Sequence, residues 1–178
     1  TEMRARGSKL TDLVILVIAA DDGVKPQTIE SIKHAKAAKV PIVVAINKCD
    51  LPEADPQKIK NQLLEHELIA EELSGDTLMV EISTKTKKNL DKLIESVLLQ
   101  AELLDLKTDY DLKSNGVVME SKIDVGRGPI VNIIVTSGTL KKGDYFVSGL
   151  HWGKVRALIN DQGLSINEAD PSTPIEVL

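Results

Sequence analysis

A continuous aliphatic stretch from Leu13 to Ala20 constrains the fold of this 178-residue chain more than any other feature. The run is far too short to span a bilayer, and it is typical of a strand buried on both faces. Two further stretches, Pro41 to Ile46 and Leu78 to Ile82, have the same character. Strands of this kind need covering layers on both sides, so they favour a parallel sheet wrapped by helices.

Segments with helical periodicity alternate with these strands. The first runs from about Gln27 to Ala38, with its apolar positions on one helical face. The second begins at Asp55-Pro56, where the aspartate predicts an N-cap and the proline suits the first turn. Asn89 is expected to cap a third, long helix, and the leucine-rich segment Leu90 to Leu104 is expected to pack into the core. This alternation predicts an α/β domain.

The pattern changes near Leu106. Lys107 to Asn115 is polar and reads as a linker, and the chain beyond it carries short β-type runs separated by glycine-containing turns. The runs are Gly116–Val125, Ile130–Thr136, Tyr145–Val147 and Val155–Ile159. Such spacing predicts a small antiparallel barrel. We therefore expect an α/β domain over residues 1–106 and an all-β domain over residues 107–178.

Composition limits the classes of partner. Hydrophobic residues make up 42% of the chain, which excludes a disordered protein, and only 2% are aromatic, so aliphatic side chains must build the core. The net charge of −5 argues against a broad basic surface for nucleic acid, although a local basic contact stays open. The single Cys49 excludes an intramolecular disulfide and fits a reducing compartment. The polar segment Thr1 to Lys9 is no secretory signal, so we expect the cytoplasm or an organelle matrix and no membrane partner.

Two polar clusters follow predicted strands, at the sheet edge where parallel α/β folds bind ligands. The first is Asn47-Lys48-Cys49-Asp50, directly after the strand that ends at Ile46. A carboxylate at Asp50 suits guanine, because it can accept hydrogen bonds from the ring N–H and the exocyclic amino group. Adenine lacks that pair of donors, and a buried Asp50 left unpaired would cost roughly 1.5–3 kcal/mol, on the order of tenfold to a hundredfold in selectivity. The Lys48 stem can lie over the base, and Asn47 can tie the loop to neighbouring backbone.

The second cluster is Ser83-Thr84-Lys85, directly after the strand that ends at Ile82. Here a backbone N–H near Thr84 could donate to the guanine carbonyl, and Ser83 could brace the loop. An N-K-x-D string by itself also occurs by chance in surface loops. The interpretation as a guanine site therefore depends on the position of the string after a buried strand and on the second cluster. Apart from Lys85, the basic run that ends at Lys88 reads as a solvated loop.

Together the clusters resemble the distal half of a GTP-binding domain, with an N-K-x-D motif and an S-A-K motif in which Thr84 replaces the usual alanine. The stretch Gly23-Val24-Lys25-Pro26-Gln27-Thr28 resembles the G-x-x-P-Q-T segment of translational GTPases. Gly126-Arg127-Gly128 and the segment from Gly138 to Asp144 resemble the second, barrel domain of the same family. Three stretches resemble the initiation factor 2 family in particular: Met3–Gly7, Ala19–Gly23 and Pro171–Leu178.

The resemblance implies part of a P-loop GTPase domain followed by a translational-factor-type barrel. It implies an intact protein that binds GTP or GDP with Mg²⁺, promotes binding of initiator tRNA to the small ribosomal subunit and subunit joining, and hydrolyses GTP. It assigns guanine binding to Asn47, Lys48, Asp50, Ser83, Thr84 and Lys85. Its implied partners are the small ribosomal subunit and ribosomal RNA, with initiator tRNA held by a domain outside this sequence. A bacterial cytoplasm, or alternatively the matrix of a mitochondrion or another organelle, and a monomer fit the resemblance.

Phosphate chemistry is not expected of this chain alone. It contains no G-x-x-x-x-G-K-[S/T] motif. In the family, the D-x-P-G-H motif that carries the magnesium contact and the water-positioning histidine precedes a segment like Thr1 to Gly7. We interpret the opening at Thr1, without methionine, as a truncation. We therefore expect no catalytic residues, no metal ligands and no GTP hydrolysis from the chain alone.

Two alternatives stay open: a translational GTPase of the elongation-factor type, and a non-catalytic ribosome-interaction module that uses only the barrel surface. On that surface, Arg127, Lys141 and Lys142 are candidates for contact with ribosomal RNA. The histidines have no metal-ligand spacing, so structural or surface roles are expected for all of them. They are His34, His66 and His151.

Overall fold

The computed structural model describes residues 2–178, without the side chains of Glu2 and Met3. Thr1, where we placed a truncation, and the Met3 side chain of the opening motif lie outside the described residues. The chain forms two compact units, Thr1–Leu106 and Lys107–Leu178, which are described separately below. Within residues 2–178, no helix combines the length and the apolar character needed to cross a membrane.

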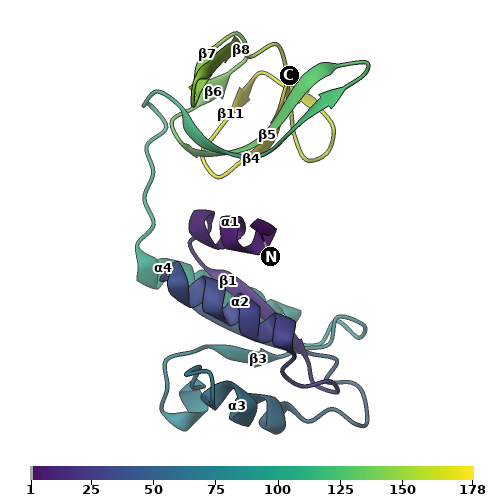
Figure 1. Ribbon diagram of the computed structural model, residues 1–178. Coiled ribbons are helices and arrows are strands. Elements are labelled where there is room, and N and C mark those ends of the chain that lie inside the picture. Colours follow the sequence, from purple (N-terminus) through teal and green to yellow (C-terminus); the bar gives the residue numbers. More distant parts are fainter. Residues whose placement is uncertain (1) are drawn as a thin grey trace. The chain divides into compact units, whose positions relative to one another are not determined.

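The first unit is an α/β unit built on a three-stranded parallel sheet (Figure 1). Its helices are α1 (Glu2–Leu10), α2 (Pro26–Ala37), α3 (Pro56–Leu64) and α4 (Leu90–Leu104), with a short 3-10 helix η1 (Glu71–Leu73). Its strands are β1 (Val14–Ala19), β2 (Ile42–Asn47) and β3 (Met79–Glu81), in the order β1-β2-β3. The register pairs Val14 with Ile42 and Val44 with Met79. The predicted parallel sheet with flanking helices is confirmed.

The two faces of the sheet are covered unequally. One face packs against α2 and α3, in a core that contains Val44, Ile59 and Leu63, all of them fully buried. Helix α4 packs on β2 and β3, and it covers the opposite face of the central strand. Ile15 and Val17 of β1 project on that opposite face and are 46% and 59% exposed. The prediction that the Leu13–Ala20 strand is buried on both faces is therefore wrong, because the covering helix stops short of β1.

Helix α4 is also less buried than predicted. None of its residues is fully buried, and Ile94, Leu98 and Leu103 are more than half exposed. The expectation of ordinary core packing along Leu90 to Leu104 is wrong, because the apolar stripe is wider than the strip of sheet it covers. The predicted cap at Asn89 is wrong as well: its side chain makes no cap bond and donates instead to the backbone carbonyl of Glu81 at 2.8 Å.

Other helix boundaries follow local sequence signals. Asp55 caps α3 as predicted, since its carboxylate accepts a hydrogen bond from the Lys58 N–H at 3.0 Å. Pro56 occupies the first turn, where its missing N–H costs nothing. Helix α1 was not predicted, because the sequence of this segment is polar and lacks a clear apolar stripe.

The second unit is antiparallel throughout its strand pairs (Figure 1). Its strands are β4 (Asn115–Asp124), β5 (Gly128–Ser137), β6 (Leu140–Lys141), β7 (Tyr145–Ser148), β8 (His151–Lys154), β9 (Leu158–Ile159), β10 (Ser165–Ile166), β11 (Glu168–Ala169) and β12 (Pro174–Val177). They form a five-stranded sheet, β10-β9-β12-β5-β4, and two two-stranded sheets, β11-β6 and the hairpin β7-β8. An aliphatic core holds them together, with Val135, Val155 and Leu158 almost completely buried.

The antiparallel β unit confirms the predicted class, but one predicted strand is wrong. The run Val155–Ile159 is not a single strand: β8 ends at Lys154, and β9 contains only Leu158 and Ile159. Between them, the N–H of Val155 bonds to the carbonyl of Asp144, and the N–H groups of Arg156 and Ala157 bond to the Leu178 carbonyl. These bonds bend the chain away from β8, a tertiary effect that a run of apolar residues does not reveal.

Candidate functional site

Three loops meet at one edge of the parallel sheet. They follow β1, β2 and β3, and because the strands are parallel their carboxyl ends lie at the same edge. The loop after β1 carries Asp21, the loop after β2 carries Lys48 and Asp50, and the loop after β3 carries Ser83 and Thr84. The structure therefore brings the two predicted clusters together, and it adds a third loop.

Asn47 ties the loop after β2 to the loop after β3. The Thr84 backbone N–H donates to Asn47 Oδ1 at 3.1 Å, and Asn47 Nδ2 donates to Thr84 Oγ1 at 3.3 Å. The side chain of Asn47 thus holds neighbouring backbone, in the manner expected from the sequence. The same bond occupies the Thr84 N–H. Within the described residues, the backbone N–H of Lys85 has no hydrogen-bond partner and is the donor left open beside it.

Ser83 orients Asp50. Its side chain is completely buried, and Ser83 Oγ donates to Asp50 Oδ1 at 2.7 Å while accepting from the Thr86 N–H at 3.1 Å. The hydrogen bond from Ser83 is the main reason why the pKa of Asp50 lies below its usual range, and the charge of Lys85 also lowers it. Asp50 itself is exposed. The assumption of a buried Asp50 is therefore wrong for this structure; its carboxylate is ionised, oriented and open to solvent.

Lys48 is held by the third loop. Its backbone adopts φ 62°, in the left-handed region, and Lys48 Nζ lies 3.1 Å from Asp21 Oδ2. The hydrogen bond and charge of Asp21 raise the pKa of Lys48. The pair fixes the direction of the lysine stem beside Asp50. Sequence reasoning missed the part of Asp21, although its position directly beyond the first apolar strand was the available signal.

A buried cation braces the strand that leads to Ser83. The side chain of Lys60, on α3, is only 4% exposed, and its Nζ lies 2.9 Å from Glu72 and 3.1 Å from Glu81. Burial by itself lowers the pKa of Lys60, but the two carboxylates outweigh that effect and the net shift is upward. Glu81 closes β3 two residues before Ser83. No sequence pattern predicted this buried ion pair, because glutamate and lysine are ordinary surface residues.

Comparison with known proteins identifies this arrangement. The family model described as "Elongation factor Tu GTP binding domain" matches residues 1–103. The chain belongs to this family. A second model, "Elongation factor G domain 2", matches residues 113–178. The predicted membership among translational GTPases is therefore confirmed.

Curated relatives are similar over the whole chain. Translation initiation factor IF-2 of Pelagibacter ubique (strain HTCC1062) is 79% identical over 178 residues, which are all of this chain and 24% of the relative. Translation initiation factor IF-2 of Cereibacter sphaeroides is 60% identical over the same 178 residues, 21% of its length. The chain thus spans about a quarter or less of the curated relatives it matches. The predicted resemblance to initiation factor 2 is confirmed.

Solved structures show the same fold at low identity. GDP-bound aIF5B from Aeropyrum pernix matches with a TM-score of 0.81 and 23% identity, over 99% of this chain and 38% of that one. The apo form of translation elongation factor SelB from Methanococcus maripaludis matches with a TM-score of 0.74 and 22% identity, over 96% and 37%. Both units of this chain therefore have counterparts of the same fold in these two translation factors.

The basic residues proposed for RNA contact do not form one cluster. Arg127, in the β4–β5 turn, is paired with Glu176 at 2.6 Å and with Asp124 at 3.5 Å. Lys141, on β6, faces Glu168 at 3.9 Å. Lys142 is exposed in the following turn. Two of the three predicted contacts thus carry their own counter-charges, which weakens them as phosphate ligands.

The remaining polar groups do not form a metal site. Within residues 2–178, no three His, Cys, Asp or Glu side chains converge in a way that could hold a metal ion. His34 Nε2 lies 3.5 Å from a carboxylate oxygen of Glu30 on the same helix, an i,i+4 pair of half-buried side chains. Cys49 is half-buried and donates to the carbonyl of Ile46, and burial raises the pKa of its thiol.

Proposed function

We propose that the edge of the parallel sheet recognises the guanine base of GTP or GDP. The observation that carries this proposal is the Ser83–Asp50 hydrogen bond of 2.7 Å, which fixes an ionised carboxylate in the loop after β2. A carboxylate has about four lone-pair sites. The hydrogen bond from Ser83 uses one of them, so the carboxylate of Asp50 can still accept from two further N–H donors. The ring N–H and the amino group of guanine are two such donors.

The other residues of the site have complementary roles in this proposal. Lys48, steered by Asp21, lies along one face of the base, and Lys85 supplies a backbone N–H for the guanine carbonyl. Asn47 holds the Thr84 loop in register with the Asp50 loop. The chain thus contributes base selection, and the phosphates and Mg²⁺ are left to residues that this sequence does not contain.

In the intact protein, we propose that this unit serves a translational GTPase that acts in initiation. The relatives that are 79% and 60% identical are both translation initiation factors, which favours this role over an elongation factor. In this role the intact protein hydrolyses GTP, promotes initiator tRNA binding to the small ribosomal subunit, and uses the β unit as a rigid surface toward the ribosome.

A nucleoside titration tests base recognition directly. Uniformly ¹⁵N-labelled chain is titrated with guanosine, and with adenosine as the matched control, while backbone amide shifts are followed by NMR. The proposal predicts shifts confined to residues 47–50 and 83–85, with guanosine only. Equal shifts with both nucleosides, or guanosine shifts confined to other residues, would contradict it.

A further inference from the structure

The strongest unexplained surface lies in the second unit, on the β7–β8 hairpin. The whole chain has only one Trp, two Tyr and one Phe, and three of these four rings, Tyr145, Phe146 and Trp152, lie in this hairpin. Trp152 is 76% exposed and Tyr145 is 72% exposed. A chain that is so poor in aromatic residues, yet places two of them in solvent on one hairpin, has a surface that core packing does not explain.

The strand register places the exposed rings on one face. Tyr145 is paired with Lys154, and Val147 with Trp152. Residues two apart on a strand project on the same side, so these four side chains share a face, which we call the aromatic face. Lys154 Nζ lies 5.4 Å from the centre of the Tyr145 ring, consistent with that arrangement, and Val147 is 79% exposed beside Trp152.

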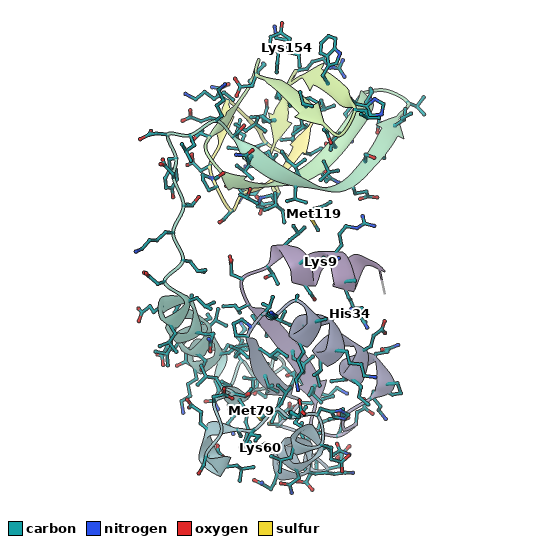
Figure 2. The ribbon with its side chains drawn as sticks, turned by 60° about the vertical axis from the view of Figure 1, so that its left-hand side comes forward. Lys9, His34, Lys60, Met79, Met119 and Lys154 are labelled. Carbon is teal, nitrogen blue, oxygen red and sulfur yellow. The ribbon has the colours of Figure 1, made fainter. Side chains whose placement is uncertain are left out.

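The opposite face of the hairpin fixes its orientation. Phe146 packs against the buried core of the second unit. Gly153, its cross-strand partner, leaves room for the ring: a Cβ there would approach the ring carbon Cζ of Phe146 to 2.8 Å. Because Phe146 anchors one side of the hairpin to the core, the aromatic face is held outward. Figure 1 shows β7 beside β8, and Figure 2 labels Lys154 on this hairpin.

The charged residue on the aromatic face is the cation Lys154, although the chain as a whole carries −5. From Tyr145 to Lys154 the sequence contains no aspartate or glutamate, and Arg156, which lies beyond the hairpin, donates to the Arg127 carbonyl at 3.0 Å. The nearest carboxylate in sequence, Asp144, accepts a hydrogen bond from the backbone N–H of Lys141 at 2.9 Å. Lys154 therefore differs from Arg127 and Lys141, which face glutamates.

We propose that the aromatic face binds unpaired RNA, with bases stacked on Trp152 and on Tyr145 and Lys154 close to the phosphate backbone. Proteins bind single-stranded nucleic acids by combining exposed aromatic rings, on which bases stack, with cations that contact the phosphates. The positive charge of Lys154 therefore suits a polyanion better than it suits an uncharged, apolar protein partner. The proposal is independent of the guanine site, which lies in the other unit.

The single tryptophan provides the measurement. Emission of Trp152 in the full 178-residue chain is followed during titration with oligouridylate and oligoadenylate. Stacking predicts saturable quenching by both. Inorganic polyphosphate of matched charge and a blunt RNA duplex are predicted to leave the emission unchanged, since neither offers an unpaired base. Binding is measured in parallel from the anisotropy of labelled RNA.

Variants then place the contact. Tyr145→Ala is expected to weaken single-strand binding about tenfold, in line with the loss of one base–aromatic stack. Lys154→Gln is expected to weaken it and to lower the salt dependence by about one ion. Lys122→Gln, which removes the same charge from an exposed position on β4 outside the hairpin, is the matched control and is expected to leave binding unchanged.

Three results would overturn the proposal: RNA that binds without changing Trp152 emission, equal quenching by polyphosphate, or equal loss of affinity in Lys122→Gln and Lys154→Gln. Absence of single-strand binding in the folded chain would overturn it as well. All three substituted side chains are exposed, and the circular dichroism spectrum verifies that each variant is folded. None of these outcomes bears on guanosine binding, so the two proposals stand or fall separately.

Discussion

Ser83 Oγ donates to Asp50 Oδ1 at 2.7 Å and joins the loop after β3 to the loop after β2. The serine is completely buried whereas the aspartate is exposed, so a rigid residue orients a solvent-facing one. The bond spans 33 positions in sequence and connects the two motifs that the sequence had suggested separately.

Ser83→Ala removes this donor and also the acceptor for the Thr86 N–H. We expect guanosine affinity to fall about tenfold, because the carboxylate of Asp50 loses the hydrogen bond that orients it. Ser96→Ala is the matched control, since Ser96 on α4 bonds only to the Lys92 carbonyl of its own helix. The measurement is the guanosine titration by NMR. Unchanged affinity in Ser83→Ala would show that Asp50 needs no support from Ser83.

The same bond predicts a pH dependence. The pKa of Asp50 is lowered in the folded chain, chiefly by the hydrogen bond from Ser83, so the charged form is favoured and its stabilising bond is fully present above the ordinary aspartate range. As the pH falls through the lowered pKa, the carboxyl group takes up a proton, and both this stabilisation and guanosine binding are lost. A carboxyl ¹³C titration should place the midpoint below the ordinary range, and Ser83→Ala should move it upward. A midpoint that is identical in both proteins would contradict this assignment.

The buried Lys60 predicts an asymmetric response to mutation. Glu72 and Glu81 are 65% and 43% exposed, so they can be rehydrated when Lys60 is replaced by methionine, and we expect a small change in stability. Replacing both glutamates by glutamine leaves a buried, uncompensated ammonium group, at a cost of about 3–5 kcal/mol. Urea unfolding of the two variants measures the difference. Equal costs would argue against burial of the charge.

The unequal covering of the sheet predicts different costs for the same substitution on adjacent strands. Val44→Ala, at a position with no exposure, should lower the free energy of unfolding by about 2 kcal/mol, from lost burial and a residual cavity. Val17→Ala, at a position that is 59% exposed, should cost less than about 1 kcal/mol. Chemical denaturation distinguishes the two. A costly Val17→Ala would indicate that the face at Ile15 and Val17 is covered in solution.

Much of the first unit could be predicted from sequence because its signals are local. The central strand, the Asp55 cap and the clusters at Asn47 and Ser83 all depend on runs of a few residues whose side-chain pattern determines their place in a parallel sheet. The exposure of Ile15 depended instead on how far α4 reaches across the sheet, which no pattern within β1 encodes.

Pairings between distant segments were the part that sequence could not supply. Lys48 with Asp21, and Lys60 with Glu81, join residues more than 20 positions apart whose types are common on any surface. In the second unit, the bend after Lys154 depends on the chain end at Leu178. Such features become visible only once the sheet has brought the segments together.

The central claim is that Asp50 selects the base. The most direct test is a variant that should prefer xanthosine to guanosine. Asp50→Asn replaces one acceptor by a donor, which matches the carbonyl that xanthine carries in place of the guanine amino group. Both proteins are titrated with guanosine and xanthosine by NMR, and unchanged resonances outside residues 47–50 and 83–85 verify the fold. We predict that the native chain responds to guanosine alone and the variant to xanthosine alone. If Asp50→Asn binds guanosine as the native chain does, Asp50 does not read the base and the account is wrong.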